Sequence, residues 1–301
     1  MVKTKEKKIN KLLMTKQERA FNTVMNILGV LITIICLYPI WYVLIASFSK
    51  PFFVDNGDVM FRTIGFNFDS YKRAFQTKGI WTSFSNTIFY TVFGVLVNMI
   101  FSTTLAYGLS KKRLVHRKAF VLFVIFTMWF NAGIIPTYLN FRDFNLLNTR
   151  TSIILGFAIN TYNMIILKSF FEQVPESLEE AAFIDGANNV RIFGQIFIPL
   201  STPALATVSL LYAVNRWNSY FWAMNLINDD KKLPLQVFLK KMIVDRVSGG
   251  EDSVILTQTS TWSQTTVIYA IIIIAIIPML IAYPFIQKYF KSGLTIGANK
   301  G

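Results

Sequence analysis

The sequence predicts an all-α integral membrane protein, on the basis of its composition, its long apolar runs and the placement of its basic residues. Of the 301 residues, 53% are hydrophobic and 15% are aromatic. The mean hydropathy is +0.45, which is more apolar than an ordinary soluble domain. A hydrocarbon core of about 30 Å needs roughly 20 apolar residues to cross it, and backbone groups within lipid must bond to one another. Each long apolar run should therefore be a helix.

About six runs reach the required length. They lie at residues 24–45, 84–109, 119–138, 152–170, 204–222 and 266–286. An even number of spans places both termini on the same side of the membrane. Pro136 lies inside the third run, where its missing backbone donor predicts a bend in the helix.

Basic residues predict which side is cytoplasmic, because Lys and Arg near span ends resist translocation. Residues 1–23 are rich in lysine, and the connection at residues 110–118 carries Lys111, Lys112, Arg113, Arg117 and Lys118. Both segments should be cytoplasmic. The connection at 140–150 holds only Arg142 and Arg150 against Asp143, which favours the outer face.

This orientation predicts a simple domain layout. Residues 1–23 form a basic cytoplasmic segment, residues 24–287 form a six-helix transmembrane domain, and residues 288–301 form a cytoplasmic tail. Within the transmembrane domain, a cytoplasmic loop covers about 173–203 and a long outer loop covers about 223–265.

Several function classes are excluded or disfavoured by composition. The net charge of +14 is concentrated at predicted membrane edges, so it does not indicate a nucleic-acid groove. The chain has one cysteine, Cys36, and one histidine, His116, so we expect no internal disulfide, no metal site and no catalytic residues. The phosphate-binding pattern G-x-x-x-x-G-K-[ST] does not occur, so the chain does not carry its own ATPase site.

The most informative segment is polar and lies between the fourth and fifth runs. It reads EEAAFIDGANNVRIFGQIFIPLSTP from Glu179 to Pro203. An acidic start favours a helix N-terminus, and Gly186 can adopt the positive φ that a sharp turn needs. The segment therefore predicts a compact helix–turn–helix on the cytoplasmic face, with its carboxylates free for a partner's cations.

The order of residues in this segment resembles the EAA motif, the cytoplasmic coupling loop in permease subunits of ATP-binding-cassette (ABC) importers. The resemblance implies a type I importer permease fold and a loop that docks on an ATPase subunit. ATP and magnesium would then be bound by partner ATPases, and this chain would bind no cofactor itself. The residues implied in ATPase coupling are Glu179, Glu180, Ala181, Ala182, Asp185, Gly186, Ala187, Phe193, Ile196 and Pro199. The alternative is that these carboxylates only solvate an interfacial helix.

Two further segments resemble the sugar-importing branch of these permeases. The tail from Gly293 to Gly301 is similar to that of maltose-type permeases, which implies ATPase contact through Leu294, Thr295, Gly297, Lys300 and Gly301. A frayed terminus is the alternative. The segments at 131–138 and 146–149 resemble the corresponding segments of permeases from oligosaccharide importers that use lipid-anchored binding proteins.

Polar residues within spans are candidates for the translocation path, since each is costly in lipid. They are Asn98, Asn215, Arg216, Trp217, Asn218 and Tyr220. Arg216 is also open to interpretation as an anchor at the outer interface or as an ion-pair partner of a second subunit. The polar groups of the second span, including Asn86 and Ser102, are expected to join helices through hydrogen bonds.

The long outer loop contains an amphipathic pattern after Pro234. Leu235, Phe238, Leu239, Met242 and Ile243 recur at helical spacing, which predicts a helix lying flat at the outer surface. This helix either contacts an extracellular binding protein, covers the bundle or rests among lipid headgroups.

Together these features predict a permease subunit of an ABC importer in the bacterial cell membrane, carrying a sugar or oligosaccharide. Its expected partners are a second homologous permease, two ATPase subunits and an extracellular lipid-anchored solute-binding protein. Polyamines, amino acids and inorganic ions are rival cargoes. An ion-coupled secondary transporter is disfavoured because none of the six runs contains Asp or Glu.

Overall fold

The computed structural model describes residues 15–130, 132–247 and 261–297, and all regular structure in this part of the chain is helical. This confirms the predicted all-α class for the described residues. The chain divides into two compact units, residues 1–74 with 254–273 and residues 75–253 with 274–301. Each unit is described by itself.

The first unit is built around the long helix α2 (Lys16–Ser47) and two short helices, α3 (Pro51–Asp55) and α4 (Asp69–Gln76), the last of which continues into the second unit. Its small core joins Ile45 and Ala46 to Val54 and Val59. Apart from Ile45, Ala46 and Ser47, α2 leaves its side chains accessible. A long helix that is apolar all round and not covered by protein is suited to lipid.

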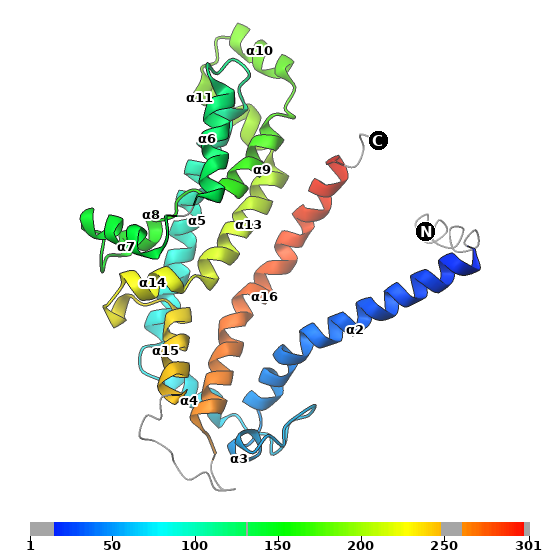
Figure 1. Ribbon diagram of the computed structural model, residues 1–301, viewed down its shortest axis with the longest axis vertical. Helices are drawn as coiled ribbons and strands as arrows, with labels where there is room; N and C mark the ends of the chain where they lie inside the picture. Colours follow the sequence, from blue (N-terminus) through cyan, green and yellow to red (C-terminus); the bar gives the residue numbers. More distant parts are fainter. Residues whose placement is uncertain (1–14, 131, 248–260, 298–301) are drawn as a thin grey trace. The chain divides into compact units, whose positions relative to one another are not determined.

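The second unit contains the bundle shown in Figure 1, in which α5, α9 and α13 pack against one another. Its helices are α5 (Ile80–Ser110), α6 (Arg117–Trp129), α7 (Ile134–Asp143), α8 (Arg150–Leu155), α9 (Thr161–Phe171), α10 (Glu176–Ile184), α11 (Asn189–Ile192), α12 (Ile198–Leu200), α13 (Thr202–Asn218), α14 (Phe221–Leu226) and α15 (Leu235–Val247). The helix α16 (Gln264–Gly297) runs through both units.

Three helices in the described residues are long and apolar enough to cross a membrane by themselves: α2, α5 and the Gln264–Pro284 part of α16. Two bent pairs pass the same test together, α6 with α7 and the segment Asn189–Leu200 with α13, which gives up to five spans. The prediction that each apolar run is one helix is wrong for the third and fourth runs, and the number of six spans stays a prediction.

The fourth predicted span, residues 152–170, is two helices rather than one. The helix α8 ends at Leu155, and α9 begins at Thr161 after Asn160, whose side chain accepts a hydrogen bond from the Asn163 backbone N–H. Within the break, Phe157 has a φ of 61°. A bulky residue in the left-handed region is uncommon and cannot continue a right-handed helix.

The third predicted span, residues 119–138, is also interrupted. The helix α6 ends at Trp129, and α7 begins at Ile134 after Gly133, which has a φ of 89°. Pro136 lies in the first turn of α7, where a missing N–H costs little. The third run is therefore interrupted, but the interruption precedes Pro136, and the predicted bend at the proline itself is wrong.

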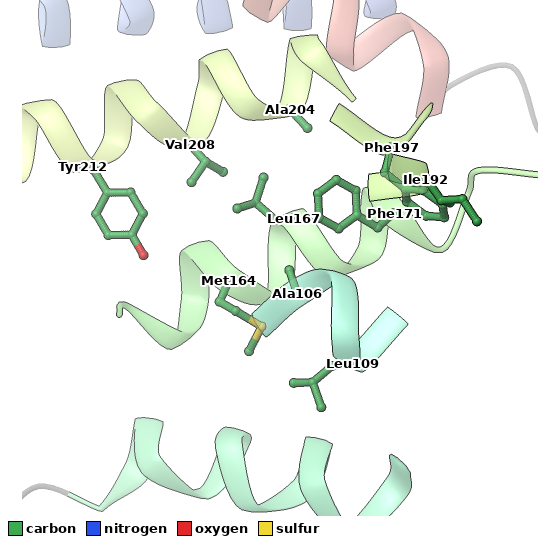
Figure 2. Close-up of a cluster of buried hydrophobic side chains, with 10 residues drawn as sticks. All are labelled: Ala106, Leu109, Met164, Leu167, Phe171, Ile192, Phe197, Ala204, Val208 and Tyr212. Carbon is green, nitrogen blue, oxygen red and sulfur yellow. The ribbon is translucent and has the colours of Figure 1, made fainter. Parts of the chain in front are cut away.

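The largest core of the second unit joins the bundle to the segment that follows α9. Figure 2 shows its buried side chains, which are Ala106, Leu109, Met164, Leu167, Phe171, Ile192, Phe197, Ala204, Val208 and Tyr212. These residues come from α5, α9, α11, α13 and the π-helical turn Phe193–Phe197. Movement of the segment after α9 is therefore mechanically connected to three helices of the bundle.

Candidate functional site

The predicted helix–turn–helix is present, and we call residues 176–200 the knob. Figure 1 shows α10 and α11 at one end of the second unit, with α15 at the other end. The turn between α10 and α11 contains Gly186, with a φ of 78° and open space around it. The Asn188 side chain caps α11 by accepting a hydrogen bond from the Arg191 N–H. The π-helical turn and α12 follow and complete the knob.

The knob is held to the end of α5 by buried and half-buried ion pairs. Lys111 Nζ lies 2.6 Å from Glu179 Oε2, and Arg113 Nη2 lies 3.3 Å from Glu179 Oε1. The side chains of Lys111 and Glu179 are only 10% and 14% exposed. Arg113 also donates to Asn189 Oδ1 at 2.6 Å. The basic connection at residues 110–118 therefore clamps both arms of the knob.

Aromatic rings surround the Lys111 ammonium. Its Nζ lies 3.7 Å from the ring centroid of Phe197 and 4.0 Å from that of Tyr107, within the range of cation–π attraction. Burial lowers the pKa of Lys111 from its usual value, and the hydrogen bond to Glu179 opposes that shift. The ion pair with Glu179 thus offsets the cost of removing the ammonium from water.

Further ion pairs surround the base of the knob. Glu172 accepts hydrogen bonds from Arg117 and, at 2.8 Å, from Lys168. On the outside, Lys112 Nζ lies 2.7 Å from Glu176 Oε2. This hydrogen bond lowers the pKa of Glu176. Since Lys112 and Glu176 are largely exposed, their pair contributes much less to stability than the pair of Lys111 and Glu179.

One expectation about the knob is wrong. Glu179 was expected to keep its carboxylate free for a partner, but that carboxylate is bound within the chain by Lys111 and Arg113. The sequence hides this because the basic connection lies far from Glu179 along the chain. Glu180 and Asp185 are exposed, and the structure gives neither an ion pair within its described part.

The outer surface of the knob combines small, acidic and apolar residues. Ile184 is 87% exposed and Val190 is 78% exposed, on either side of the Gly186 turn. Ala181 and Pro199 are exposed, whereas Ala182, Ala187, Phe193 and Ile196 are half-buried and pack against the core shown in Figure 2. The predicted coupling residues therefore divide into an accessible set and a set that ties the knob to the bundle.

Arg216, a candidate for the translocation path, has a capping role in the structure. Its guanidinium donates to the backbone carbonyls of Ile153, Ile154 (3.2 Å), Gly156 (3.3 Å) and Phe157 (3.4 Å). These carbonyls lie at the end of α8 and in the following break, where helix geometry provides no backbone donor. Arg216 thus satisfies polar groups that would otherwise be costly within a membrane.

Asn98 of α5 and Tyr212, which lies on α13 with Arg216, complete this cap. The Asn98 side chain accepts from Arg216 Nε at 2.9 Å and donates to the carbonyls of Phe157 and Ala158 at 3.0 and 2.7 Å. The Tyr212 hydroxyl accepts from the Asn160 N–H at 3.0 Å and lies 2.6 Å from Ser102 Oγ. We call Asn98, Ser102, Tyr212 and Arg216 the break cap.

A glycine makes room for this cap. A Cβ atom added at Gly94 of α5 would lie 2.9 Å from Arg216 Nε and 3.0 Å from its Cδ. Such contacts are closer than carbon and nitrogen atoms pack. The absence of a side chain at Gly94 therefore lets Arg216 cross α5 and reach the break.

The remaining path candidates divide between the interior and the surface. Trp217 is buried, donates from Nε1 to the Ala275 carbonyl at 3.1 Å and stacks edge-on against Phe84. Asn215, Asn218 and Tyr220 are exposed in this chain. The structure therefore brings Asn98 and Arg216 together in the break cap, while the path role of the exposed residues stays a prediction.

Asn86, Asn98 and Ser102 of the second span bond to other segments, as expected, whereas Thr103 and Thr104 bond to carbonyls of their own helix. Asn86 Nδ2 donates to the carbonyls of Lys231 and Leu233 at 2.8 and 3.1 Å, and Tyr90 donates to Lys232 at 2.8 Å. Thr87 accepts from the Leu235 N–H at 2.7 Å. The start of α15 is thereby attached to α5.

The predicted outer helix is present as α15, but its buried face differs from the expected one. Leu235 and Leu239 are buried as predicted, Val237 is also buried, and Ile243 is 39% exposed. At the C-terminus, Leu294, Thr295 and Gly297 lie in the last turns of α16. Lys300 and Gly301 lie outside the described residues.

Comparisons with known proteins agree with this geometry. Residues 79–296 match the family described as binding-protein-dependent transport system inner membrane component. The chain is 39% identical over 285 residues to the polygalacturonan/rhamnogalacturonan transport system permease protein YtcP of Bacillus subtilis, covering 95% of this chain and 100% of that protein. It is 38% identical over 269 residues to the protein LplC of the same organism, covering 89% of this chain and 90% of that protein.

Solved structures show the same fold. A chain of a bacterial ABC transporter involved in the import of the acidic polysaccharide alginate superposes with a TM-score of 0.85 at 45% identity, covering 92% of this chain and 99% of that one. A second chain comes from an alginate ABC transporter in complex with an alginate pentasaccharide-bound periplasmic protein. It has a TM-score of 0.57 at 14% identity, covers 89% of this chain and 93% of that one, and supports the fold alone.

The family match extends from the start of α5 to the last turn of α16, so it includes the knob, the break cap and the bundle core. Relatives of similar length align over nearly their whole sequence. The chain therefore belongs to the family of inner-membrane components of binding-protein-dependent transport systems, and its work is transport across the membrane.

Proposed function

We propose that this chain is one of two permeases in an ABC importer that carries an oligosaccharide, and that its knob receives mechanical work from an ATPase subunit. The observation that supports this most is the construction of the knob. It presents an accessible apolar and acidic tip, and its base is clamped to α5 and packed against α9 and α13. A surface of this kind suits docking, because a push at the tip is passed to the bundle rather than absorbed by a loose loop.

The proposed partners follow from the chemistry that the chain lacks. Two ATPase subunits bind ATP and magnesium and close on the knob, a second homologous permease completes the path, and an extracellular lipid-anchored binding protein delivers the cargo. The tail residues Leu294, Thr295, Gly297, Lys300 and Gly301 add a second contact with the ATPases. Nucleotide binding shifts the bundle between inward-open and outward-open states only if it favours one of them.

The proposed membrane topology has six crossings with both termini in the cytoplasm. The knob and the basic connection at 110–118 are then on the inner side, consistent with the cluster of cations there. The α6–α7 and α8–α9 pairs each cross as interrupted spans. Non-helical backbone at membrane depth is tolerated where protein groups satisfy it, as the break cap does.

An oligosaccharide cargo is supported by the relatives. YtcP is named for polygalacturonan and rhamnogalacturonan, and the structural neighbour imports alginate. The exposed Asn215, Asn218 and Tyr220 offer hydrogen-bonding groups suited to sugar hydroxyls. Uptake of an amino acid or a polyamine with no uptake of saccharide would assign a different cargo.

The test of the knob is the substitution Gly186→Trp. A large side chain at a φ of 78° on the exposed turn should block docking without entering the bundle. We expect saccharide uptake by the reconstituted transporter to fall at least about tenfold, which corresponds to roughly 1.4 kcal/mol or more of lost coupling. ATP hydrolysis should no longer respond to the loaded binding protein.

A matched control lies at the other end of the second unit. Lys240→Trp also places an indole on an exposed position, but on α15, and it should leave coupling unchanged. Wild-type uptake by Gly186→Trp in a correctly assembled complex would refute the docking role.

A further inference from the structure

A second accessible cavity of the second unit lies at the beginning of α5, at the far end of that helix from the knob. It measures about 490 Å³ and is lined by Trp81, Thr82, Ser85, Asn86, Phe89 and Arg150. We call it the Arg150 pocket. Its volume is within the range of pockets that hold small ligands, and in the proposed topology it opens on the outer side.

The walls of the Arg150 pocket are aromatic. Trp81 is 55% exposed although Phe75 stacks on it with ring centroids 5.5 Å apart. Phe89 lies two helical turns further along the same face of α5, since positions i, i+4 and i+8 share a face. Flat aromatic faces of this kind pack against the C–H groups of sugar rings.

One residue that lines the pocket, the exposed Arg150, is a cation. The Arg150 guanidinium lies 5.3 Å from the ring centroid of Phe89 and donates from Nη2 to Asn86 Oδ1 at 3.0 Å. Within the described residues the structure gives Arg150 no carboxylate partner. A guanidinium has five donors in a planar fork, which matches a carboxylate in bidentate geometry.

Asn86 fixes the position of this cation. Its Nδ2 is already committed to the carbonyls of Lys231 and Leu233, so Oδ1 is turned toward Arg150. Asn86 is 4% exposed and therefore cannot rearrange freely. One hydrogen bond from this fixed amide and the Phe89 ring thus orient the exposed guanidinium before a ligand arrives, which reduces the entropy lost on binding.

We propose that the Arg150 pocket binds a carboxylated sugar residue, so that the cargo of this permease is an acidic, uronate-containing oligosaccharide. The carboxylate pairs with Arg150, the ring packs on Trp81 and Phe89, and Thr82 and Ser85 face the hydroxyl groups. This inference rests on the proposed saccharide import and narrows it to one chemical class. It concerns residues outside the predicted path set.

The test uses the complete transporter, with both permeases and both ATPases, in nanodiscs of phosphatidylcholine. Trigalacturonate and its methyl ester are titrated by calorimetry, because the ester keeps the rings and removes the charge. We expect the wild type to bind the acid at least about tenfold more tightly than the ester. Arg150→Gln should abolish this difference in affinity, because it weakens binding of the acid and leaves binding of the ester unchanged. Arg150→Lys should keep part of the difference.

Two further variants separate the ring contacts from general damage. Trp81→Ala should lower the affinity for both ligands by a similar factor, since it removes an aromatic contact and leaves the charge of Arg150 in place. Arg142→Gln is the matched control, because Arg142 is an exposed arginine paired with Asp143. This variant should bind both ligands as tightly as the wild type does. The unfolding temperature of each variant confirms assembly.

Equal wild-type affinity for acid and ester, or acid binding that survives Arg150→Gln, would overturn the proposal. So would an Arg150→Gln effect confined to nanodiscs with anionic lipid, since the pocket would then hold a lipid phosphate. Saccharide uptake measured in parallel tests the proposed saccharide import separately from the proposed preference for acidic sugars. Uptake of neutral oligosaccharides without acid preference defeats only this inference, whereas no saccharide uptake at all defeats the proposed cargo class.

Discussion

Arg216 shows how a charged side chain within an apolar run can be structural. Its guanidinium donates hydrogen bonds to the side chain of Asn98 and to four backbone carbonyls, those of residues 153, 154, 156 and 157. The dipoles of these carbonyls stabilise its positive charge. A sequence pattern can place such a residue within a span, but it cannot show which backbone the side chain meets. The backbone partners lie about 60 residues away along the chain, so the sequence favours a path role for Arg216 and leaves an anchor or an ion pair as alternatives.

Replacement of Arg216 by Met should destabilise the bundle. The substitution keeps an apolar stem and leaves the carbonyls of the break without their donor, so we expect a loss of about 3 kcal/mol in the free energy of unfolding. Chemical unfolding of the purified chain in detergent, followed by tryptophan fluorescence, measures it. Arg216→Lys, with fewer donors, should lose less.

Asn215→Ala is the neighbouring control for this substitution. Asn215 is exposed, and its loss should change the free energy of unfolding by no more than about 0.5 kcal/mol. If Arg216→Met were as stable as Asn215→Ala, the capping role would be wrong and a role in the path would be favoured.

Helices and turns that are stabilised by residues close together in the sequence can be predicted from that sequence. The acidic start and the Asp-Gly turn of the knob lie within one segment, and the helix–turn–helix forms as expected. The fourth run, residues 152–170, predicts one helix from its length and its overall apolar character, although it contains Asn160, Asn163 and Lys168. Its break depends on Asn98, Tyr212 and Arg216, which lie on other helices. Gly156, at the end of α8, and Asn160, which caps α9, are the local residues that mark it.

The clamp between α5 and the knob should behave as a coupled pair. Glu179→Gln leaves the Lys111 ammonium without its carboxylate, so it should cost about 3 kcal/mol of stability. Lys111→Met leaves Glu179 paired with Arg113, so it should cost less. The exchange Lys111→Glu with Glu179→Lys should recover part of this loss. A double-mutant cycle on unfolding free energies measures the coupling.

The exposed pair of Lys112 and Glu176 provides the comparison for that cycle. Its side chains are 75% and 58% exposed, so its coupling should be much smaller than that of Lys111 with Glu179. Equal coupling energies in the two pairs would contradict a buried clamp that transmits force to α5.

The complete chain combines apolar spans that composition alone could predict with contacts that only the folded bundle provides. Mean hydropathy and basic connections predict an integral membrane protein because they depend on the solvent around each segment. The Arg150 pocket could not be predicted in this way, since Trp81 and Arg150 meet only when α5 and α8 pack together. The family match then adds the transport role that no single contact establishes.

The orientation and docking of the knob can be measured together with one accessible thiol. Ile184 is 87% exposed at the tip, so Ile184→Cys in a Cys36→Ser background gives a single reporter for a membrane-impermeant maleimide. We predict no labelling from outside intact cells, strong labelling in inverted vesicles stripped of the ATPases, and protection when the ATPases are restored. Labelling of Cys at position 184 from outside intact cells would contradict a cytoplasmic knob that receives work from the ATPases.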